Sequence, residues 1–227
     1  MQRKTIVSCA LFAAFIGGAL AVRLSGVIPA SVRDFGFSNA PLARVQMIAA
    51  IVPWLIFSIY WEAAAKNAAA AASSESKLSR GIHVTLTNLA VLLEVVQLPV
   101  LGRFVPVSSA AIAAGLAVSG IGLFIAIWSR RHLGRNWSGE ISIKVGHQLI
   151  RSGPYRRLRH PIYTGILTIY AGTAIVTGTW LAILGLAIAA FAYARKIRLE
   201  EANLRVAFGP DYDAYCHETW ALVPWIY

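Results

Sequence analysis

Acidic residues and cysteine are scarce in this sequence of 227 residues. There are 10 Asp and Glu residues against 21 Lys and Arg residues, and only 14% of the chain is charged. The two cysteines, Cys9 and Cys216, lie near opposite ends of the chain, a spacing that gives neither a disulfide framework nor a metal site. The sequence therefore excludes a small disulfide-stabilised fold, and we predict no metal site.

Apolar residues dominate instead, at 57% of the chain. This composition is too apolar for a soluble domain and predicts an all-α, polytopic integral membrane protein. The net charge of +11 could suggest a nucleic-acid partner, but the basic residues lie between apolar runs and form no basic face with interleaved aromatic residues. We therefore expect membrane lipids with anionic headgroups, and no nucleic acid, as the partners of this charge.

Four apolar runs in the first part of the chain have about the length of a transmembrane helix. The first follows a short basic segment, so a cleaved signal peptide is an alternative, but its length and the spans after it favour a helix. The third run carries Glu94 and Gln97 near its end, and we assign Glu94 no role. The predicted spans, which make up an N-terminal region over 1–128, are about 5–22, 45–61, 82–101 and 108–128.

Two shorter apolar runs, 164–176 and 180–193, follow later and are separated by a Thr-Gly-Thr turn. Each is short for a full crossing at 1.5 Å per residue, so we predict a helical hairpin over 164–193 that begins and ends on the same side. In this layout, most Lys and Arg residues outside the spans lie on the same side of the membrane as the N-terminus. The positive-inside rule makes that side cytoplasmic. We expect a bacterial inner-membrane protein with both termini in the cytoplasm.

One long polar segment, residues 130–163, interrupts the apolar sequence. It is too rich in charge to lie in hydrocarbon, where a central Arg or Lys costs about 2.5–3.5 kcal/mol. A basic loop that only sets the membrane topology is one interpretation. However, imidazoles, phenols and turn residues recur in it at short intervals, and topology needs only charge. With the C-terminal tail, 195–227, expected on the same side, the segment predicts a functional site within 129–227.

Five short motifs follow one another across this C-terminal part of the chain. They are LGRNWS (133–138), GHQLI (146–150), SGPY (152–155), RHPIY (159–163) and EEANLRVAFGPDYDAY (200–215). At these residues the sequence resembles the isoprenylcysteine carboxyl methyltransferase (ICMT) family, together with its bacterial and phospholipid methyltransferase relatives. No motif is specific alone, and their order is what indicates the superfamily.

The resemblance implies methyl transfer from S-adenosyl-L-methionine (SAM) to an acceptor, which in the namesake members is the carboxylate of a C-terminal prenylated cysteine. A carboxylate is ionised at neutral pH and needs no general base, so positioning and desolvation can supply the catalysis. The cofactor would lie in a cytoplasmic site between the polar segment and the tail. The implied cofactor-binding residues are His147, Gln148, Leu149, Ile150, Tyr155, His160, Pro161, Ile162, Tyr163, Glu200 and Glu201.

Pro161 has a role that its own chemistry predicts. A proline disfavours helical geometry at His160 and can open the next helix, whose free N–H groups favour an anion. Simpler interpretations stand beside the functional ones. His160 can hydrogen-bond a neighbouring loop, the tyrosines can be interfacial aromatic residues, and Glu201 can pair with Arg198 on a solvated helix.

One position departs from the family pattern. Four residues before the first glutamate of the last motif, the family has an Arg proposed to hold the substrate carboxylate, and this sequence has Lys196. A lysine can neutralise a carboxylate but cannot bind it bidentately, and Arg195 or Arg198 can substitute. We predict these three as the catalytic residues. The acceptor stays open: a prenylcysteine, a phospholipid amine or another isoprenoid acid, methylated at oxygen or nitrogen.

Two other functions compete with this one. The C-terminal sequence DYDAYCHETWALVPWIY also resembles the ends of sterol and steroid reductases, which use NADPH, and Arg156 with Arg157 could meet a 2′-phosphate. A non-enzymatic membrane accessory protein is the other. The LGRNWS motif and the spacing from GHQLI to SGPY fit the methyltransferases better. We therefore predict a membrane-embedded, SAM-dependent methyltransferase that acts on a lipophilic or prenylated substrate, with an undetermined oligomeric state.

Overall fold

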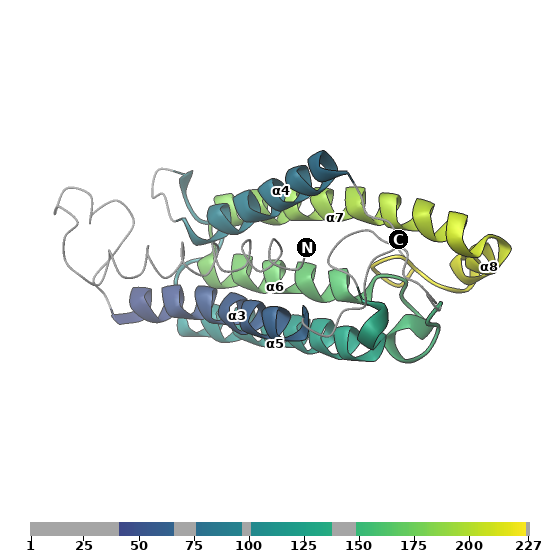
Figure 1. Cartoon of the computed structure of the whole chain (residues 1–227). Helices are drawn as coiled ribbons and strands as arrows, with labels where there is room; N and C mark the ends of the chain where they lie inside the picture. The colour runs from purple at the N-terminus through teal and green to yellow at the C-terminus, as the bar shows by residue number, and fades with distance from the viewer. Residues whose placement is uncertain (1–40, 66–75, 97–100, 138–148, 226–227) are drawn as a thin grey trace.

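A computed structural model describes residues 41–65, 76–96, 101–137 and 149–225. In these residues the predicted all-α class is confirmed, since no strand is present and the only ladder pairs are two isolated bridges. The predicted span 5–22 lies outside the described residues. The elements, shown in Figure 1, are α3 (Pro41–Ala65), α4 (Lys77–Val95), α5 (Ser109–Leu133), η2 (Gly134–Asn136), η3 (Gly153–Arg156), α6 (Pro161–Thr177), α7 (Trp180–Phe208) and α8 (Pro210–Glu218).

The helices form a bundle with α6 at its centre. Figure 1 shows α4 beside α7 on one side of α6, and α3 with α5 on the other. The turn between α6 and α7 lies at one end, where the Phe104 amide donates to the Gly178 carbonyl at 2.9 Å and Gln46 of α3 donates to the Val176 carbonyl at 2.7 Å. Helices α6 and α7 therefore run antiparallel from this turn, as the predicted hairpin requires, and α6 begins toward the opposite end of the bundle.

Three of the described helices are long and apolar enough to cross a membrane, namely α3, α5 and α7, while α6 is a shorter apolar helix. The second apolar run of the hairpin, 180–193, is the first part of a longer helix, because α7 continues without a break from Trp180 to Phe208. Arg, Lys and Glu are good helix formers, so the change from apolar to charged residues near 195 ends the hydrophobic stretch and not the helix.

Two other helices differ from the predicted spans. Helix α4 begins and ends earlier than the predicted span 82–101, and Gln97 lies outside the described residues. Helix α5 runs on into the polar segment, where Arg130 is buried. Its guanidinium lies 4.1 Å from the Trp137 ring centroid and donates to the Ala64 carbonyl at 2.6 Å. The bundle therefore buries Arg130 of the polar segment with a carbonyl partner and an aromatic ring beside its charge.

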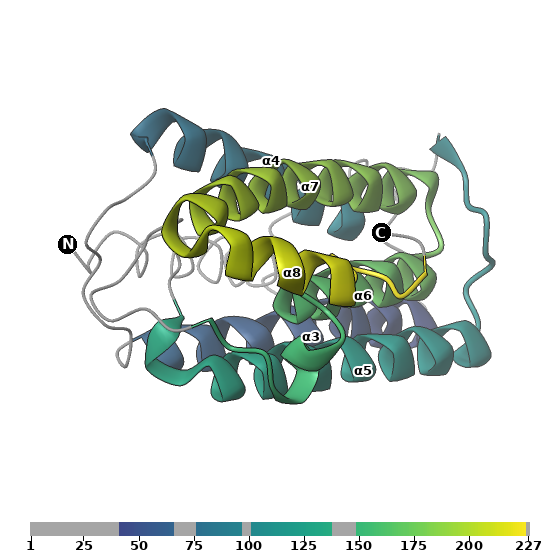
Figure 2. The same ribbon diagram turned by 90° about the vertical axis from the view of Figure 1, so that its right-hand side faces the viewer.

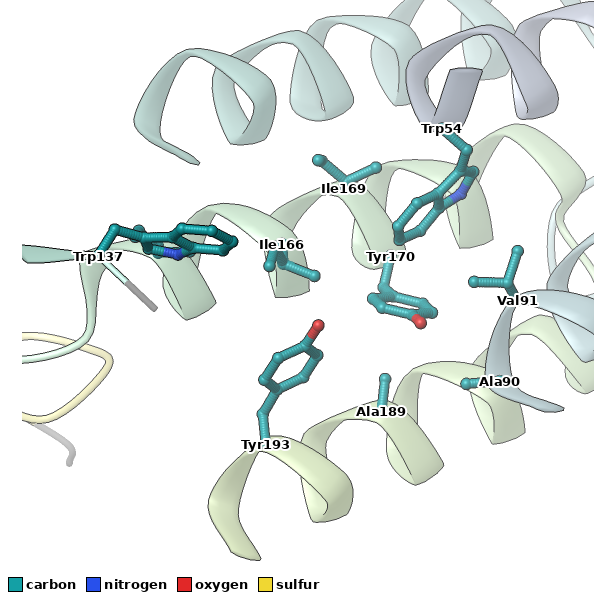
Figure 3. Close-up of a cluster of buried hydrophobic side chains, with 10 residues drawn as sticks. Trp54, Ala90, Val91, Trp137, Ile166, Ile169, Tyr170, Ala189 and Tyr193 are labelled. Atoms are coloured by element: carbon teal, nitrogen blue, oxygen red, sulfur yellow. The ribbon is translucent and has the colours of Figure 1, made fainter. Parts of the chain in front are cut away.

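Aromatic residues fill the core between the two sides of the bundle (Figure 3). The rings of Trp54 and Tyr170 meet edge to face at 4.5 Å, and Tyr193 points from α7 toward Ile166 of α6. Glu94 is fully buried on α4, and neither carboxylate oxygen has a hydrogen-bond partner among the described residues. This core joins α3, α4, α6 and α7, and it reaches Ile162 in the first turn of α6.

The contact between α5 and α6 depends on glycine. A β-carbon at Gly122 would lie 2.6 Å from the Gly165 carbonyl oxygen, whereas a β-carbon at Gly120 on the same helix would meet nothing within 4 Å. We expect Gly122→Ala to lower the unfolding free energy by about 1–3 kcal/mol because it forces the helices apart. Thermal unfolding in detergent measures this, with Gly120→Ala as the matched control. Equal melting temperatures for the two variants would contradict the close approach.

Candidate functional site

The start of α6 is the centre of the candidate site. His160 has φ −125° and ψ 55°, outside helical geometry, and α6 begins at Pro161, as the chemistry of proline predicted. The Tyr163 amide donates to the His160 carbonyl at 3.0 Å, which closes the first turn. His160, Pro161 and Ile162 are buried, and Tyr163 is half-buried. The RHPIY motif is thus the point where the chain enters the bundle.

The C-terminal tail lies against this motif by backbone hydrogen bonds. The Arg159 amide donates to the Trp220 carbonyl at 2.8 Å, and the His160 amide donates to the Ala221 carbonyl at 3.0 Å. The hydroxyl of Thr164, one turn into α6, donates to the Leu222 carbonyl at 2.7 Å. Figure 2 shows α8 folded back from the end of α7, which brings the tail to this position. The expected meeting of the tail with the polar segment is confirmed here.

Glu201 of α7 is held by three cationic side chains. Arg159 Nε donates to Glu201 Oε1 at 2.7 Å, and His160 Nε2 lies 3.2 Å from the same oxygen. Arg205, one turn further along α7, approaches the other oxygen at 3.6 Å, while Arg198 is exposed. Arg159 also donates to the carbonyls of Cys216 and Thr219. Glu201 therefore joins the start of α6 to α7 and the tail.

Glu200 lies on the other side of His160. The Tyr163 hydroxyl donates to Glu200 Oε1 at 2.6 Å, and His160 Nδ1 is 3.5 Å from Glu200 Oε2. Burial lowers the pKa of His160, but its bonds to Glu200 and Glu201 outweigh that effect and raise the pKa above its usual value. His160 and Tyr163 also stack with ring planes 7° apart. The arrangement favours a cationic imidazole between two carboxylates.

The three cations predicted as catalytic occupy different environments. Lys196 is buried on α7, one turn before Glu200 and so on the same helix face. Arg195 donates to the Ser79 hydroxyl of α4 at 2.9 Å, and Arg198 is exposed. Of the three, Lys196 is the one that the fold places beside Glu200, and its role in the reaction stays a prediction.

The predicted residues before RHPIY are only partly described. His147 and Gln148 lie outside the described residues, and Leu149 and Ile150 are half-buried in the segment that leads to η3. Tyr155 of η3 is buried, and its carbonyl accepts a 2.6 Å hydrogen bond from the Tyr215 hydroxyl of α8. Burial of Tyr215 raises its pKa to about 12. Tyr155 therefore anchors the tail.

Two residues of the cluster were not singled out from the sequence. Arg159 is part of the RHPIY motif, so its position was available, but its bond to Glu201 depends on the approach of α7. His83 is on α4, far from every motif, and its ring meets the Tyr193 ring edge to face at 5.1 Å. Nothing near His83 in the sequence indicates this contact.

Comparisons with known proteins agree with the motifs. A family model described as phospholipid methyltransferase matches residues 110–211. A probable protein-S-isoprenylcysteine O-methyltransferase of Oryza sativa subsp. indica is 31% identical over 96 residues, which cover 41% of this chain and 50% of the relative. The protein-S-isoprenylcysteine O-methyltransferase B of Arabidopsis thaliana is 29% identical over 96 residues. These residues cover 41% of this chain and 49% of the Arabidopsis protein. The chain thus spans about half the length of these curated relatives.

A solved structure of the eukaryotic intramembrane Ras methyltransferase ICMT is similar to this one, and the alignment covers 99% of this chain and 93% of the ICMT chain. The sequence identity is 17% and the TM-score is 0.48. The family model and the plant relatives support the resemblance to the isoprenylcysteine methyltransferases that the five motifs indicate.

Proposed function

Because residues 110–211 match the phospholipid methyltransferase model, we propose that this chain is a membrane-embedded, SAM-dependent methyltransferase acting on a lipophilic acceptor. The observation that carries the proposal is the cluster of His160, Tyr163 and Glu200 at the start of α6, which lies within the matched residues. A buried charged cluster at the end of an apolar bundle is unusual unless it serves a polar ligand.

The chemical groups of the cluster fit the amino acid end of SAM. That end carries one ammonium and one carboxylate. The cluster offers a group of opposite charge to each, the Glu200 carboxylate and the cationic His160. The cofactor supplies an electrophilic methyl group on a sulfonium. We assign Glu200 to the ammonium, and the cationic His160 with the positive N-terminal end of α6 to the carboxylate. Glu201 is already held by Arg159 and His160, so it positions the cluster.

Lys196 is assigned to the acceptor. It lies one turn before Glu200 on α7 and is buried, so its charge can meet an anionic group that enters from the apolar side. A carboxylate acceptor is ionised at neutral pH and needs no proton removal. The side chains then have only to orient it and exclude water. A carboxylate O-methylation like that named for the plant relatives is the reaction that this arrangement favours.

The site is proposed to face the cytoplasm of a bacterial inner membrane. Cations of the cluster, of η3 and of the 195–205 part of α7 gather at one end of the bundle. Cytoplasmic loops of membrane proteins carry an excess of Lys and Arg. SAM is a cytoplasmic metabolite, so the same orientation gives the cofactor direct access.

Replacement of Lys196 by alanine tests the division of roles. We expect affinity for S-adenosylhomocysteine to stay within about twofold and kcat to fall about tenfold, because a charge on the acceptor is left without its partner. Calorimetric titration and a radiolabel transfer assay in detergent measure the two quantities. Lys77→Ala, at the exposed start of α4, is the control. A large loss of cofactor affinity in Lys196→Ala would show that Lys196 belongs to the cofactor.

The proposed function itself is tested by titrating the purified wild-type protein with S-adenosylhomocysteine and, separately, with NADPH. Saturable binding of the first alone supports the methyltransferase. Binding of NADPH alone would assign the chain to the reductases instead. Binding of neither ligand would leave the non-enzymatic accessory protein as the function to pursue.

A further inference from the structure

The end of the tail exposes apolar side chains that the proposed chemistry does not use. Trp225 is 84% exposed and Val223 is 44% exposed. The ring of Trp225 lies 5.4 Å from the ring of the half-buried Trp220. We call Trp220, Val223 and Trp225 the apolar tip of the tail. Exposed apolar residues that lie together mark an interaction surface, whereas single ones are common on any protein.

The backbone of the tail places the apolar tip beside the first turn of α6. The Arg159 amide donates to the Trp220 carbonyl at 2.8 Å, just before the helix begins. Two residues later in the tail, the Leu222 carbonyl accepts a 2.7 Å hydrogen bond from the hydroxyl of Thr164. Thr164 is about 5 Å into α6 at 1.5 Å per residue. The tail therefore follows α6 into the bundle from its start, and Figure 1 shows it running back beside this helix.

Helix α6 fixes the depth of the apolar tip in the membrane. It is an apolar helix of 17 residues, which makes it about 25 Å long. This length is less than the ~30 Å of the hydrocarbon core, so the first turn of α6 lies at the hydrocarbon boundary and not in bulk water. Tryptophan is enriched at this boundary because its ring is apolar and its N–H can hydrogen-bond. The exposed side of the apolar tip therefore meets the membrane interface.

An exposed arginine adjoins the apolar tip. The Trp220 amide donates to the Arg157 carbonyl at 3.1 Å, and Leu158 forms an isolated bridge with Trp220. The side chain of Arg157 is exposed. Basic side chains beside exposed aromatic ones are typical of protein surfaces that lie in the interface of a membrane with anionic lipids. The charge and the depth of this surface therefore fit a lipid partner.

We propose that the apolar tip and Arg157 form a membrane anchor that binds anionic phospholipid at the interface. The ring of Trp225 lies among the lipid headgroups, and the Arg157 guanidinium pairs with a lipid phosphate. The backbone of the same tail segment is bonded to Arg159 and Thr164, so lipid that holds the tip also keeps the tail against the candidate site. The anchor itself does not depend on the proposed function.

Tryptophan fluorescence tests the depth of the tip without any cofactor. The full-length protein is placed in nanodiscs of phosphatidylcholine and phosphatidylglycerol that contain lipids brominated either near the headgroup or at the methyl end of the acyl chains. The emission of Trp225→Phe is subtracted from that of the wild type. We expect bromine near the headgroup to quench the Trp225 emission about twofold more strongly than bromine at the methyl end. Equal quenching by the two lipids, or quenching by neither, would overturn the anchor.

Hydrogen exchange of the Trp220 amide measures how firmly lipid holds the tail. In the anionic nanodiscs we expect Trp225→Ser to raise the exchange rate about tenfold, because a detached tail frees this amide. Arg157→Ala keeps the carbonyl that binds the amide, so it should raise the rate about fivefold in anionic nanodiscs and leave it unchanged in phosphatidylcholine alone. Arg157→Lys should restore most of the protection. Trp180→Ser, at the exposed start of α7, is the matched control.

The outcomes separate a lipid contact from a contact within the protein. An effect of Arg157→Ala that is equal in the two kinds of nanodisc would overturn the assignment of its side chain to lipid. Equal exchange in the wild type and Trp225→Ser would overturn the whole anchor. Titration with S-adenosylhomocysteine in the anionic nanodiscs should show weaker binding by Trp225→Ser, because the tail lies against the candidate site. If the wild type does not bind this ligand, the proposed function fails, while fluorescence and exchange still decide the anchor.

Discussion

Replacing Glu200 with alanine is expected to weaken binding of S-adenosylhomocysteine about a hundredfold, the larger of the expected effects on ligand binding. Among the described residues Glu201 is held by arginines, whereas the bonds of the Glu200 carboxylate are to His160 and Tyr163. Removal of Glu200 takes away the partner of the cofactor ammonium and leaves the cationic His160 closer to that charge. Charge-assisted hydrogen bonds are about twice as strong as neutral ones, so the loss is large. Calorimetric titration in detergent measures it.

Two further variants control this experiment. Glu200→Gln keeps an acceptor for the Tyr163 hydroxyl but removes the charge, and we expect most of the loss to persist. Glu218→Ala removes an exposed carboxylate at the end of α8 and should leave affinity unchanged. Unchanged affinity in both Glu200 variants, with normal thermal stability, would show that the cofactor binds elsewhere.

Arg159→Ala is expected to cause the largest loss of stability, about 3–5 kcal/mol. The guanidinium binds Glu201 at 2.7 Å and two carbonyls of the tail, at Cys216 and Thr219. Its side chain is 13% exposed and that of Glu201 is 11% exposed, so solvent screens the pair little. Removal of the guanidinium leaves the buried Glu201 carboxylate without its shortest ion pair and takes away two of the hydrogen bonds that hold the tail. Thermal unfolding should therefore shift to a much lower temperature.

The neighbouring Arg156→Ala is the matched control, because Arg156 is exposed in η3 and should change the melting temperature little. Arg159→Lys should recover part of the stability, since an ammonium can reach Glu201 but cannot hold the two tail carbonyls as well. Limited proteolysis provides a second measurement: cleavage after residue 210 should become faster in Arg159→Ala alone. Equal melting temperatures for the Arg156 and Arg159 variants would contradict a tail anchored at Arg159.

Much of the site was predictable because its signals are local in the sequence. Pro161 opens α6 through the geometry of its own ring, and this required no knowledge of the fold. The order of the motifs indicated that the polar segment and the tail belong to one site, and the hydrogen bonds of Arg159 and His160 to the tail agree with it. The lengths of helices were less predictable. Helix α4 (Lys77–Val95) begins and ends earlier than the apolar run 82–101, because hydropathy marks the solvent and not the ends of a helix.

By itself, the sequence determined the helical membrane class, the turn at the start of α6 and the resemblance to methyltransferases, because hydropathy, proline geometry and motif order act within short stretches of chain. Only the tertiary structure decided which charges meet. It paired Glu201 with Arg159 and left Arg198 exposed, and it placed His83 of α4 against Tyr193 of α7. Such contacts depend on the rotation of each helix about its axis. That rotation is set by packing of all the helices together, at glycine contacts such as Gly122 against Gly165 and around the aromatic core.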